Sequence, residues 1–207
     1  MLRKILIILV FCISLICTAQ KIEKYDTIIN VQGYYKAYYN KRIQCSTYVI
    51  YKLYKGGGDI SRSNIKFKPY NKLPHFKYNV RGYDRGHLVN AEDFAYSKKA
   101  LVSTFYYINC VPQSTKLNRG SWKKIESDVR KLSQKDSLLI ICGGCDYGKK
   151  DNYLIPNNCF KIVYSLSTKR CICSLLFCND NSGMFKTDNT LQRKITFKKA
   201  LLLYNKD

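Results

Sequence analysis

The sequence predicts an α+β domain with strands in the majority, because short apolar segments typical of strands outnumber the helical ones. The chain has 207 residues, 46% of them hydrophobic, so it is long enough to bury a core of its own. Its formal net charge of +22 specifies no fold but favours an acidic partner: nucleic acid, an anionic membrane surface or an acidic glycan. We therefore expect one strongly basic α+β domain.

Strands are predicted where Tyr, Val and Ile are enriched or where a short apolar run lies between turn residues. The first two form a hairpin joined through residues 40–45, and a long irregular connection follows over 59–83. Long loops in compact domains usually carry function, so this connection is of interest. The predicted strands are 31–39, 46–54, 105–111, 137–142, 160–166 and 171–178.

Helices are predicted at two places. The stronger pattern covers 118–132, where a single face carries the apolar side chains, which are Trp122, Ile125, Val129 and Leu132. We expect this face to pack on the sheet, with Trp122 in the core. A basic helix is predicted over 190–203, near the C-terminus.

The N-terminus has the features of a secretory signal peptide. Arg3 and Lys4 precede a long apolar run, and Ala19 is a small residue at the expected cleavage point. The run is short for a membrane span, and an uncleaved anchor is the alternative. We expect removal of residues 1–19, a single domain over 20–207, a secreted or periplasmic product and no stable membrane association.

Eight cysteines remain after the predicted cleavage, and export makes disulfides permissible. Six of the eight lie within residues 142–178, where we expect at least one disulfide. Alternation along a strand places Cys171 and Cys173 on one face, so these two are not expected to pair with each other. A zinc site at Cys142 and Cys145 is the alternative, which ranks second because no further pair follows at matching spacing.

Residues 84–87, Asp-Arg-Gly-His, combine a carboxylate, a cation and a base around a glycine that permits a tight backbone. The chain has two histidines, so a His-rich metal site is excluded and histidine chemistry must use His75 or His87. Phosphodiester hydrolysis needs a base for water, a cation on the phosphoryl oxygens and stabilisation of the leaving oxygen. Neutral His87 can supply the base, and Arg85 beside it disfavours the protonated form.

These four residues resemble the D-R-G-H signature of the DNA/RNA non-specific endonucleases, which are ββα-metal (His-Me finger) nucleases. Further matches follow in the family's order and spacing at 104–105, 109–113, 117–122 and 125–126. The resemblance covers about residues 33–180. It implies the ββα-metal nuclease fold, with a central antiparallel sheet flanked by helices.

The resemblance also implies a metal site. Asn118 would be the only protein ligand of a Mg²⁺ ion, with Mn²⁺ as the alternative, and Glu126 would hold the metal-bound waters. The two residues are ~12 Å apart along an ideal helix, too far for both to touch one ion directly. Mg²⁺ retains several waters, which fits such a site. The i,i+4 spacing of Glu126 and Arg130 predicts an ion pair that fixes the glutamate.

The remaining roles are implied in the same way. His87 would be the general base that activates water. Arg62 and Arg85 would bind the scissile phosphate and spread its transition-state charge. Asn109 would orient groups around the metal-bound water, and Asp84 would brace the motif.

The resemblance is incomplete at two places: Asn90 stands where the family commonly has a proline, and the C-terminal tail is basic where the family often has an acidic helix. We expect a secreted, Mg²⁺-dependent, sugar-non-specific endonuclease that leaves 5′-phosphate ends on DNA and RNA. The alternative is a non-catalytic, basic nucleic-acid-binding protein with a decayed nuclease fold. The joint presence of His87, Asn118 and Glu126 favours the enzyme. An immunity or inhibitor protein and the oligomeric state are left open.

Overall fold

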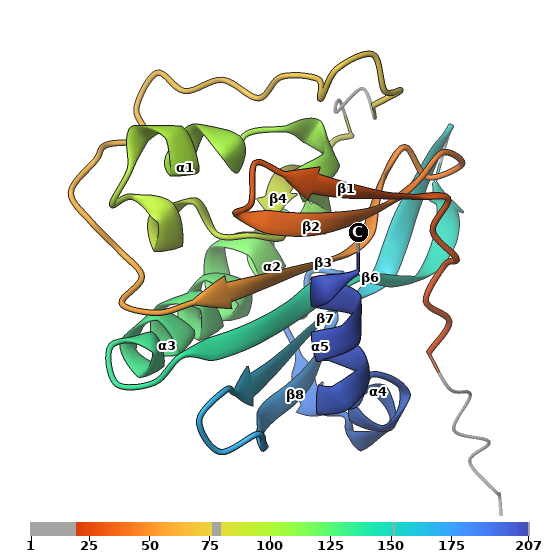
Figure 1. Ribbon diagram of the computed structural model, residues 1–207. Helices are drawn as coiled ribbons and strands as arrows, with labels where there is room; N and C mark the ends of the chain where they lie inside the picture. Colours follow the sequence, from red (N-terminus) through yellow and green to blue (C-terminus); the bar gives the residue numbers. More distant parts are fainter. Residues whose placement is uncertain (1–19, 76–79, 151, 207) are drawn as a thin grey trace, which may run out of the picture.

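The computed structural model describes residues 20–75, 80–150 and 152–206, which form a twisted antiparallel sheet with helices on both faces (Figure 1). The predicted signal peptide lies outside the described residues. All neighbouring strands of the main sheet pair antiparallel, so the predicted fold class is confirmed. In spatial order the strands are β1 (Thr27–Val31), β2 (Tyr35–Asn40), β3 (Cys45–Leu53), β6 (Leu138–Lys150), β7 (Tyr153–Ser165), β8 (Cys171–Cys178) and β9 (Phe185–Thr187).

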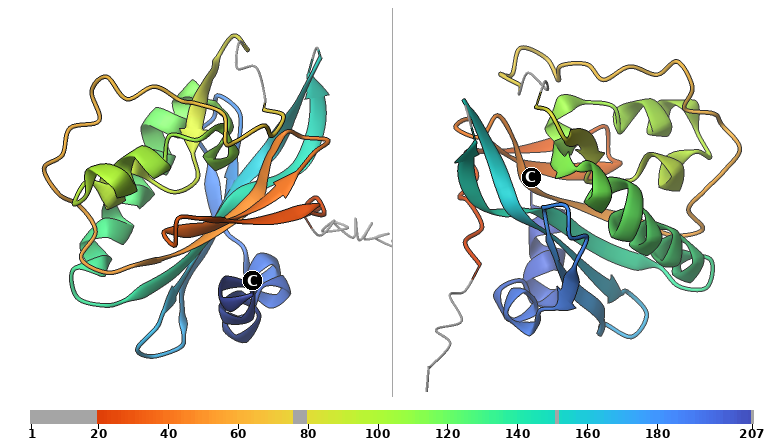
Figure 2. Two further views of the ribbon diagram at one scale, coloured as in Figure 1. Left: turned by 45° about the horizontal axis from the view of Figure 1, so that its top comes forward. Right: turned by 180° about the vertical axis from the view of Figure 1, so that it is seen from behind.

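The sheet buries a separate apolar core on each face, as alternation along the strands requires (Figure 2). In β6, Ile140 packs into one core and Ile141 into the other. We call the side covered by α3 (Lys123–Ser133) the α3 face. The opposite side is the α5 face, which is covered by α4 (Asn189–Lys194) and α5 (Phe197–Asn205).

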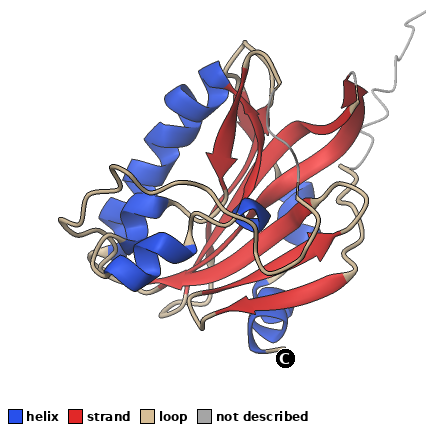
Figure 3. Cartoon of the chain, turned by 90° about the horizontal axis from the view of Figure 1, so that it is seen from above, coloured by secondary structure: helices blue, strands red, loops and turns tan. Residues whose placement is uncertain are grey.

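A ββα unit lies on the α3 face. β4 (Tyr83–His87) and β5 (Cys110–Ser114) form a separate antiparallel pair, and the chain then continues through helical segments into α3. The long connection before β4 contains no helix or strand among its described residues, as predicted (Figure 3). The shorter elements of this unit are η1 (Ala91–Phe94), α1 (Lys98–Ser103), η2 (Tyr107–Asn109), α2 (Thr115–Leu117) and η3 (Asn118–Trp122).

Several predicted strands have different bounds in the structure. β6 and β7 extend well beyond the predicted strands 137–142 and 160–166, and two further segments differ in kind. The hairpin of β2 and β3 is confirmed, but the predicted strand 31–39 is interrupted after Val31 by a turn in which Gln32 and Gly33 adopt positive φ. The segment predicted as strand 105–111 is instead a 3₁₀ turn that ends at Asn109, and β5 begins only at the next residue. Apolar composition identified both segments, but local turn geometry decided where pairing starts.

The predicted helices also differ at their ends. Trp122 and Val129 are buried on the α3 face, as expected, whereas Leu132 lies in the last turn and remains 43% exposed. The single helix predicted over 190–203 is broken into α4 and α5. Ile195 has a non-helical backbone there, and Thr196 starts the second helix by accepting a hydrogen bond from the backbone N–H of Lys199. Among the described residues, no helix is both long and apolar enough to cross a membrane.

The expected disulfide is not confirmed, because all eight described cysteines are free thiols. The strand register explains this for the central strands. Cys142 lies opposite Val49 on one side and Lys161 on the other, and its Sγ donates a hydrogen bond to the carbonyl oxygen of Leu88. No cysteine is paired directly opposite another in the described strands.

The prediction that Cys171 and Cys173 share one face is wrong. The register of β7 against β8 shifts between Val163 and Tyr164, which is a β-bulge. As a result Cys171 packs against the core of the α5 face and Cys173 against the core of the α3 face.

Candidate active site

A cavity of about 680 Å³ opens on the α3 face, between β4, the start of α3 and the long loop before β4. Six of the seven residues proposed for the site line this cavity: Arg62, Asp84, Arg85, His87, Asn118 and Glu126. They come from segments far apart in the sequence, so their convergence is a property of the fold.

Pairing of β4 with β5 positions the Asp-Arg-Gly-His segment. Gly86 lies opposite Val111, two positions along the ladder from the pair formed by Asp84 and Gln113. A Cβ atom at Gly86 would lie 2.1 Å from Oε1 of Gln113 and 2.5 Å from its Cγ. The glycine is therefore required because the Gln113 side chain packs against it, and not because of an unusual backbone conformation as the sequence suggested.

The His87 ring is held between two phenylalanines, with centroid distances of 4.8 Å to Phe67 and 4.9 Å to Phe105. Burial, together with the smaller effect of the nearby charge of Arg62, lowers the pKa of His87 to about 3. Its Nε2 atom is buried and has no hydrogen-bond partner among the described residues. A neutral imidazole with an unused nitrogen is suited to accept a proton. Arg62, rather than Arg85, is the cation that acts on the pKa.

Asn118 lies at the start of η3, a π-helical turn in which Gly120 has a non-helical backbone. Its Nδ2 donates a hydrogen bond of 3.0 Å to Oδ2 of Asp84. Only the amide nitrogen can donate to a carboxylate, so this bond fixes the amide orientation and leaves the oxygen to bind a ligand. The kinked turn thus presents an oxygen donor at the cavity.

Asp84 contacts the start of the helical region through a partner that the sequence did not reveal. Arg119 donates two hydrogen bonds of 2.9 Å to its carboxylate, from Nε and Nη2. Burial raises the pKa of Asp84, but the hydrogen bonds from Arg119 and Asn118 outweigh it and hold this pKa below its ordinary value. The aspartate therefore stays ionised, joining β4 to the start of the helix.

Glu126 lies in the first turn of α3. Burial raises its pKa to about 7, even though the ammonium of Lys161 lowers it. A bound cation would favour the ionised form. Among the described residues, no group of three His, Cys, Asp or Glu side chains is placed to hold a metal ion. The oxygens of Asn118 and Glu126 beside one cavity fit a hard divalent cation that keeps most of its waters.

The predicted ion pair of Glu126 with Arg130 does not form among the described salt bridges. Arg130 instead bonds Asp93, with 2.8 Å between Nε and Oδ1, and contacts Glu92 at 3.2 Å. The i,i+4 spacing would also allow a pair with Glu126. Only 1% of the Asp93 side chain is exposed, however, so leaving its charge without a partner would be strongly destabilising, and Arg130 pairs with it. Arg130 thus ties α3 to η1 beside the cavity.

Lys161 is a further charged residue that the sequence did not single out for the site. It is 1% exposed, and its Nζ lies 4.5 Å from the centroid of the Trp122 ring. The indole N–H of Trp122 donates to the carbonyl oxygen of His87 at 3.3 Å. The sequence offered one sign of this residue: a lysine inside an otherwise apolar strand segment. Its charge lowers the pKa values of Glu126 and Asp93, against the larger effect of burial.

Asn109 is the one proposed residue that the structure does not place at the cavity. Its Oδ1 accepts a hydrogen bond from the backbone N–H of Val89, and its Nδ2 donates to the carbonyl oxygens of Val89 and Thr104. The side chain is fully buried and its amide is used by the backbone. It supports the chain segment after His87 and is not available to a metal-bound water.

Comparison with known proteins identifies the family. The family model described as DNA/RNA non-specific endonuclease matches residues 19–198, nearly the whole chain. The protein belongs to this family. The match extends beyond the segment in which the sequence motifs were found.

The relatives of this endonuclease family member include mitochondrial nucleases. Human mitochondrial nuclease EXOG is 30% identical over 128 residues, covering 51% of this chain and 35% of EXOG. Bovine mitochondrial endonuclease G is 32% identical over 114 residues, covering 51% of this chain and 38% of that protein. A nuclease of Nostoc sp. is 28% identical over 154 residues, covering 69% of this chain and 56% of that nuclease. The match spans well under half of the two mitochondrial relatives.

A solved structure supports the same fold. The crystal structure of the EndoG/EndoGI complex, which concerns the mechanism of EndoG inhibition, contains a chain with a TM-score of 0.66 and 23% identity. The similarity covers 80% of this chain and 83% of that chain. The central antiparallel sheet and the ββα unit are therefore those of a ββα-metal nuclease.

Asn90, which replaces the family's usual proline, has a local structural role. Its Oδ1 accepts a hydrogen bond of 2.7 Å from the backbone N–H of Glu92, which caps η1. Asn90 also lines the cavity. The departure alters how the loop after His87 is capped and removes no group from the site.

Replacing Arg130 with alanine should lower the free energy of unfolding by about 3 kcal/mol, because it leaves Asp93 buried without its partner. Burial raises the pKa of Asp93 to about 6, and loss of Arg130 should raise it further. A carboxyl whose pKa is higher in the folded than in the unfolded state favours folding at low pH and loses this contribution as pH rises. Chemical unfolding should therefore show a larger deficit at pH 8 than at pH 5.

Arg130→Lys is the matched control, since it keeps a cation beside Asp93 and should retain part of the stability. The same deficit for Arg130→Ala at both pH values would mean that lost packing, and not the uncompensated carboxylate, causes the effect.

Proposed function

We propose that this protein is a secreted or periplasmic, Mg²⁺-dependent endonuclease that hydrolyses the phosphodiester bonds of both DNA and RNA without sequence preference. The observation that carries the proposal is the convergence of a neutral histidine, an oriented asparagine oxygen, a glutamate and two arginines on one cavity. The family's printed description and the nucleases among its relatives support the same activity.

Each group of the cavity has a chemical task in this proposal. His87 accepts the proton of the attacking water at its unpaired nitrogen. Arg62 and Arg85 bind the phosphate and stabilise the charge that grows on it in the transition state. Glu126 orients water molecules beside Asn118. In this proposal the water attacks phosphorus in line with the bond to the 3′ oxygen; that bond breaks, the departing oxygen takes a proton from water, and a 5′-phosphate and a 3′-hydroxyl remain.

A divalent cation is proposed at the oxygen donors of Asn118 and Glu126. Mg²⁺ fits best because an almost all-water shell suits it, and Mn²⁺ is the alternative. Such an ion would supply Lewis-acid stabilisation of the phosphoryl and leaving oxygens. Asp84 contributes by holding the Asn118 amide in the orientation that exposes its oxygen.

The charge of the chain suits a sequence-independent substrate. Without Arg3 and Lys4 of the proposed signal peptide, the formal net charge is +20. Contacts to phosphates give affinity without sequence discrimination, so binding should weaken steeply as salt rises. Phe67 and Phe105, the aromatic side chains that pack on His87, serve to position its imidazole ring.

Localisation and protein partners follow from separate considerations. Export through residues 1–19 would keep a non-specific nuclease away from the nucleic acid of its own cell. The related EndoG is known in complex with EndoGI in a structure that concerns its inhibition. We propose that an immunity or inhibitor protein could bind this endonuclease at the open side of the same cavity.

Cleavage assays test the proposal. Purified protein should nick plasmid DNA and degrade RNA, and EDTA should stop both while leaving DNA binding largely intact, since basic side chains supply most of the affinity. Added Mg²⁺ should restore cleavage. Binding without cleavage of either polymer at any tested metal concentration would favour the non-catalytic nucleic-acid-binding alternative. Full cleavage by metal-free protein in EDTA would contradict the metal dependence.

A further inference from the structure

The α5 face carries a second basic cavity, separated from the proposed active site by the sheet. Its volume is about 630 Å³. Lys169 and Arg170 reach it from the connection between β7 and β8, and Arg193 reaches it from α4. Tyr164 and Phe197, which also line it, pack against each other in the core of the α5 face. A bound anion here would be held by residues that the proposed catalytic chemistry does not use.

The cations of this cavity lack acidic partners. In the described part of the chain, no ion pair involves Lys169, Arg170 or Arg193. Residues 189–206 contain five basic residues and no acidic one. The preceding Asp188 is buried, and its carboxylate accepts the backbone N–H groups of the first turn of α4. The three side chains therefore present uncompensated positive charge to solvent.

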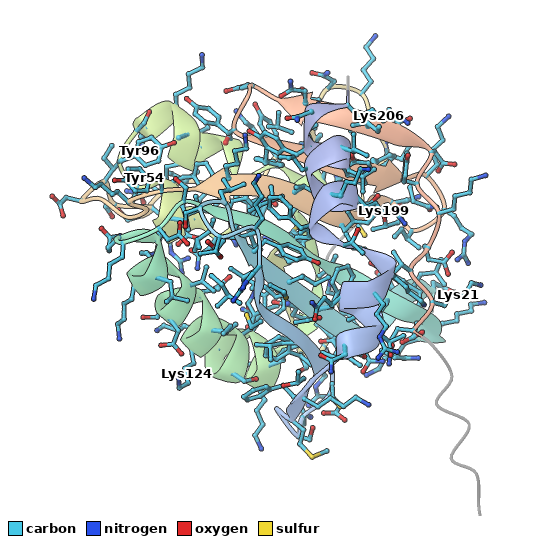
Figure 4. The ribbon with its side chains drawn as sticks, turned by 60° about the horizontal axis from the view of Figure 1, so that its bottom comes forward. Lys21, Tyr54, Tyr96, Lys124, Lys199 and Lys206 are labelled. Atoms are coloured by element: carbon cyan, nitrogen blue, oxygen red, sulfur yellow. The ribbon has the colours of Figure 1, made fainter. Side chains whose placement is uncertain are left out.

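The basic surface continues past α4. A neighbouring cavity of about 590 Å³ is lined by four lysines, Lys21, Lys24, Lys194 and Lys199, and by one acidic residue, Glu23, which pairs with Lys21 at 3.8 Å. Arg193 and Lys194 are consecutive in the chain and each lines one of the two cavities. Lys199 of α5 and Lys206, which directly follows α5, lie on the side where Lys21 also lies (Figure 4). We call the residues that line the two cavities with positive charge the distal basic face.

Nucleic acid is the occupant that this surface fits best. Guanidinium groups bind phosphate with two parallel hydrogen bonds, and polar side chains of Asn189 and Gln192 lie in the same cavity. An anionic membrane fits less well because the apolar side chains of α5 mostly pack against the sheet. Leu202 is exposed by 63%, whereas Leu201 and Leu203 contact the core.

We propose that the distal basic face is a second nucleic-acid-binding surface, which holds the phosphate backbone of a segment other than the one being cleaved. The proposal rests on the proposed function, since it supplies that nuclease with a second contact to the same polymer. The intervening sheet prevents one short duplex from occupying both sites. On a long polymer, binding at the second surface raises the effective concentration of cleavable segments at the first.

The decisive measurement is the number of short duplexes that one chain binds. It is made in EDTA with the His87→Ala protein, so that no substrate is consumed. We expect two bound duplexes per chain, and a single one after the further changes Lys169→Ala, Arg170→Ala and Arg193→Ala. The salt dependence of binding to long DNA should also become shallower, with the slope of log K against log salt reduced by about 2–3.

A matched control removes the same charge elsewhere. Lys41, Lys55 and Lys135 are exposed and line none of the cavities described here. Their replacement by alanine should leave two duplexes bound and the slope nearly unchanged. In the active enzyme, the Lys169, Arg170 and Arg193 changes should slow degradation of long DNA while sparing short oligonucleotides.

Three outcomes would overturn the inference. One bound duplex in the parent protein would mean that no second surface exists. Equal losses in the test and control variants would mean that net charge alone sets binding. Loss of binding to vesicles containing phosphatidylglycerol, with duplex binding retained, would assign the surface to membranes. Duplex counts do not depend on cleavage, so failure of the proposed nuclease activity would be recognised separately.

Discussion

Replacing His87 with alanine should lower kcat/KM for DNA and for RNA by about 10²–10⁴-fold, the range of general-base contributions. The imidazole is the one described histidine that lines the cavity; burial lowers its pKa, so it is neutral at pH 7, and its Nε2 has no partner among the described residues. Binding of DNA in EDTA should change little, because the phosphate contacts come from arginine and lysine side chains. Single-turnover cleavage and a binding assay on the same protein separate the two effects.

His75→Ala is the matched control. This histidine stacks on Tyr107 with 4.6 Å between ring centroids and lies outside the residues that line the cavity. We expect it to retain most of the wild-type activity. Equal activity of wild type and His87→Ala would eliminate the proposed mechanism, and equal loss in both histidine variants would indicate a shared effect on folding.

Replacing Asn118 with alanine should reduce cleavage by at least about 10²-fold at limiting Mg²⁺, because it removes the only amide oxygen proposed to bind the cation directly. It also removes the hydrogen bond to Asp84. Two readouts test this: the Mg²⁺ concentration needed for half-maximal cleavage should rise, and Mg²⁺ should no longer raise the melting temperature.

Asp84→Asn separates positioning from direct binding. The variant keeps the size of the side chain but loses the ionised acceptor of Asn118 and Arg119. We expect a smaller loss of metal affinity, about 10–100-fold, as is typical when a group that orients a ligand is changed. An unchanged Mg²⁺ requirement in Asn118→Ala would place the metal elsewhere.

Much of the proposed site could be recognised from sequence because its chemistry is concentrated in short segments. Asp84, Arg85 and His87 lie within one strand, and Asn118 and Glu126 lie at the start of one helical region. When such a segment folds as one strand or one helix, its residues keep the spacing that the sequence shows. For Arg130 the i,i+4 spacing predicted the wrong partner. It predicted an ion pair with Glu126, whereas Arg130 pairs with the buried carboxylate of Asp93 from another element.

Residues with no local motif were missed or misassigned. Arg119 and Lys161 act on the site through contacts with residues more than 30 positions away, Asp84 and Trp122. Asn109 belongs to a recognised motif, yet its amide is used by the backbone. A sequence pattern shows which chemical groups a segment contains. It does not show which other groups they contact in the folded protein.

The sequence by itself determined the fold class, the strands and main helix in outline, and the groups able to carry out phosphodiester chemistry, because apolar periodicity and short motifs are local properties. Tertiary structure decided the rest. Close packing of Gln113 explains Gly86, a bulge in β7 and β8 places Cys171 and Cys173 on opposite faces, and burial sets the pKa of His87. These depend on burial and on contacts across the chain, which exist only once the sheet has formed and its faces are covered.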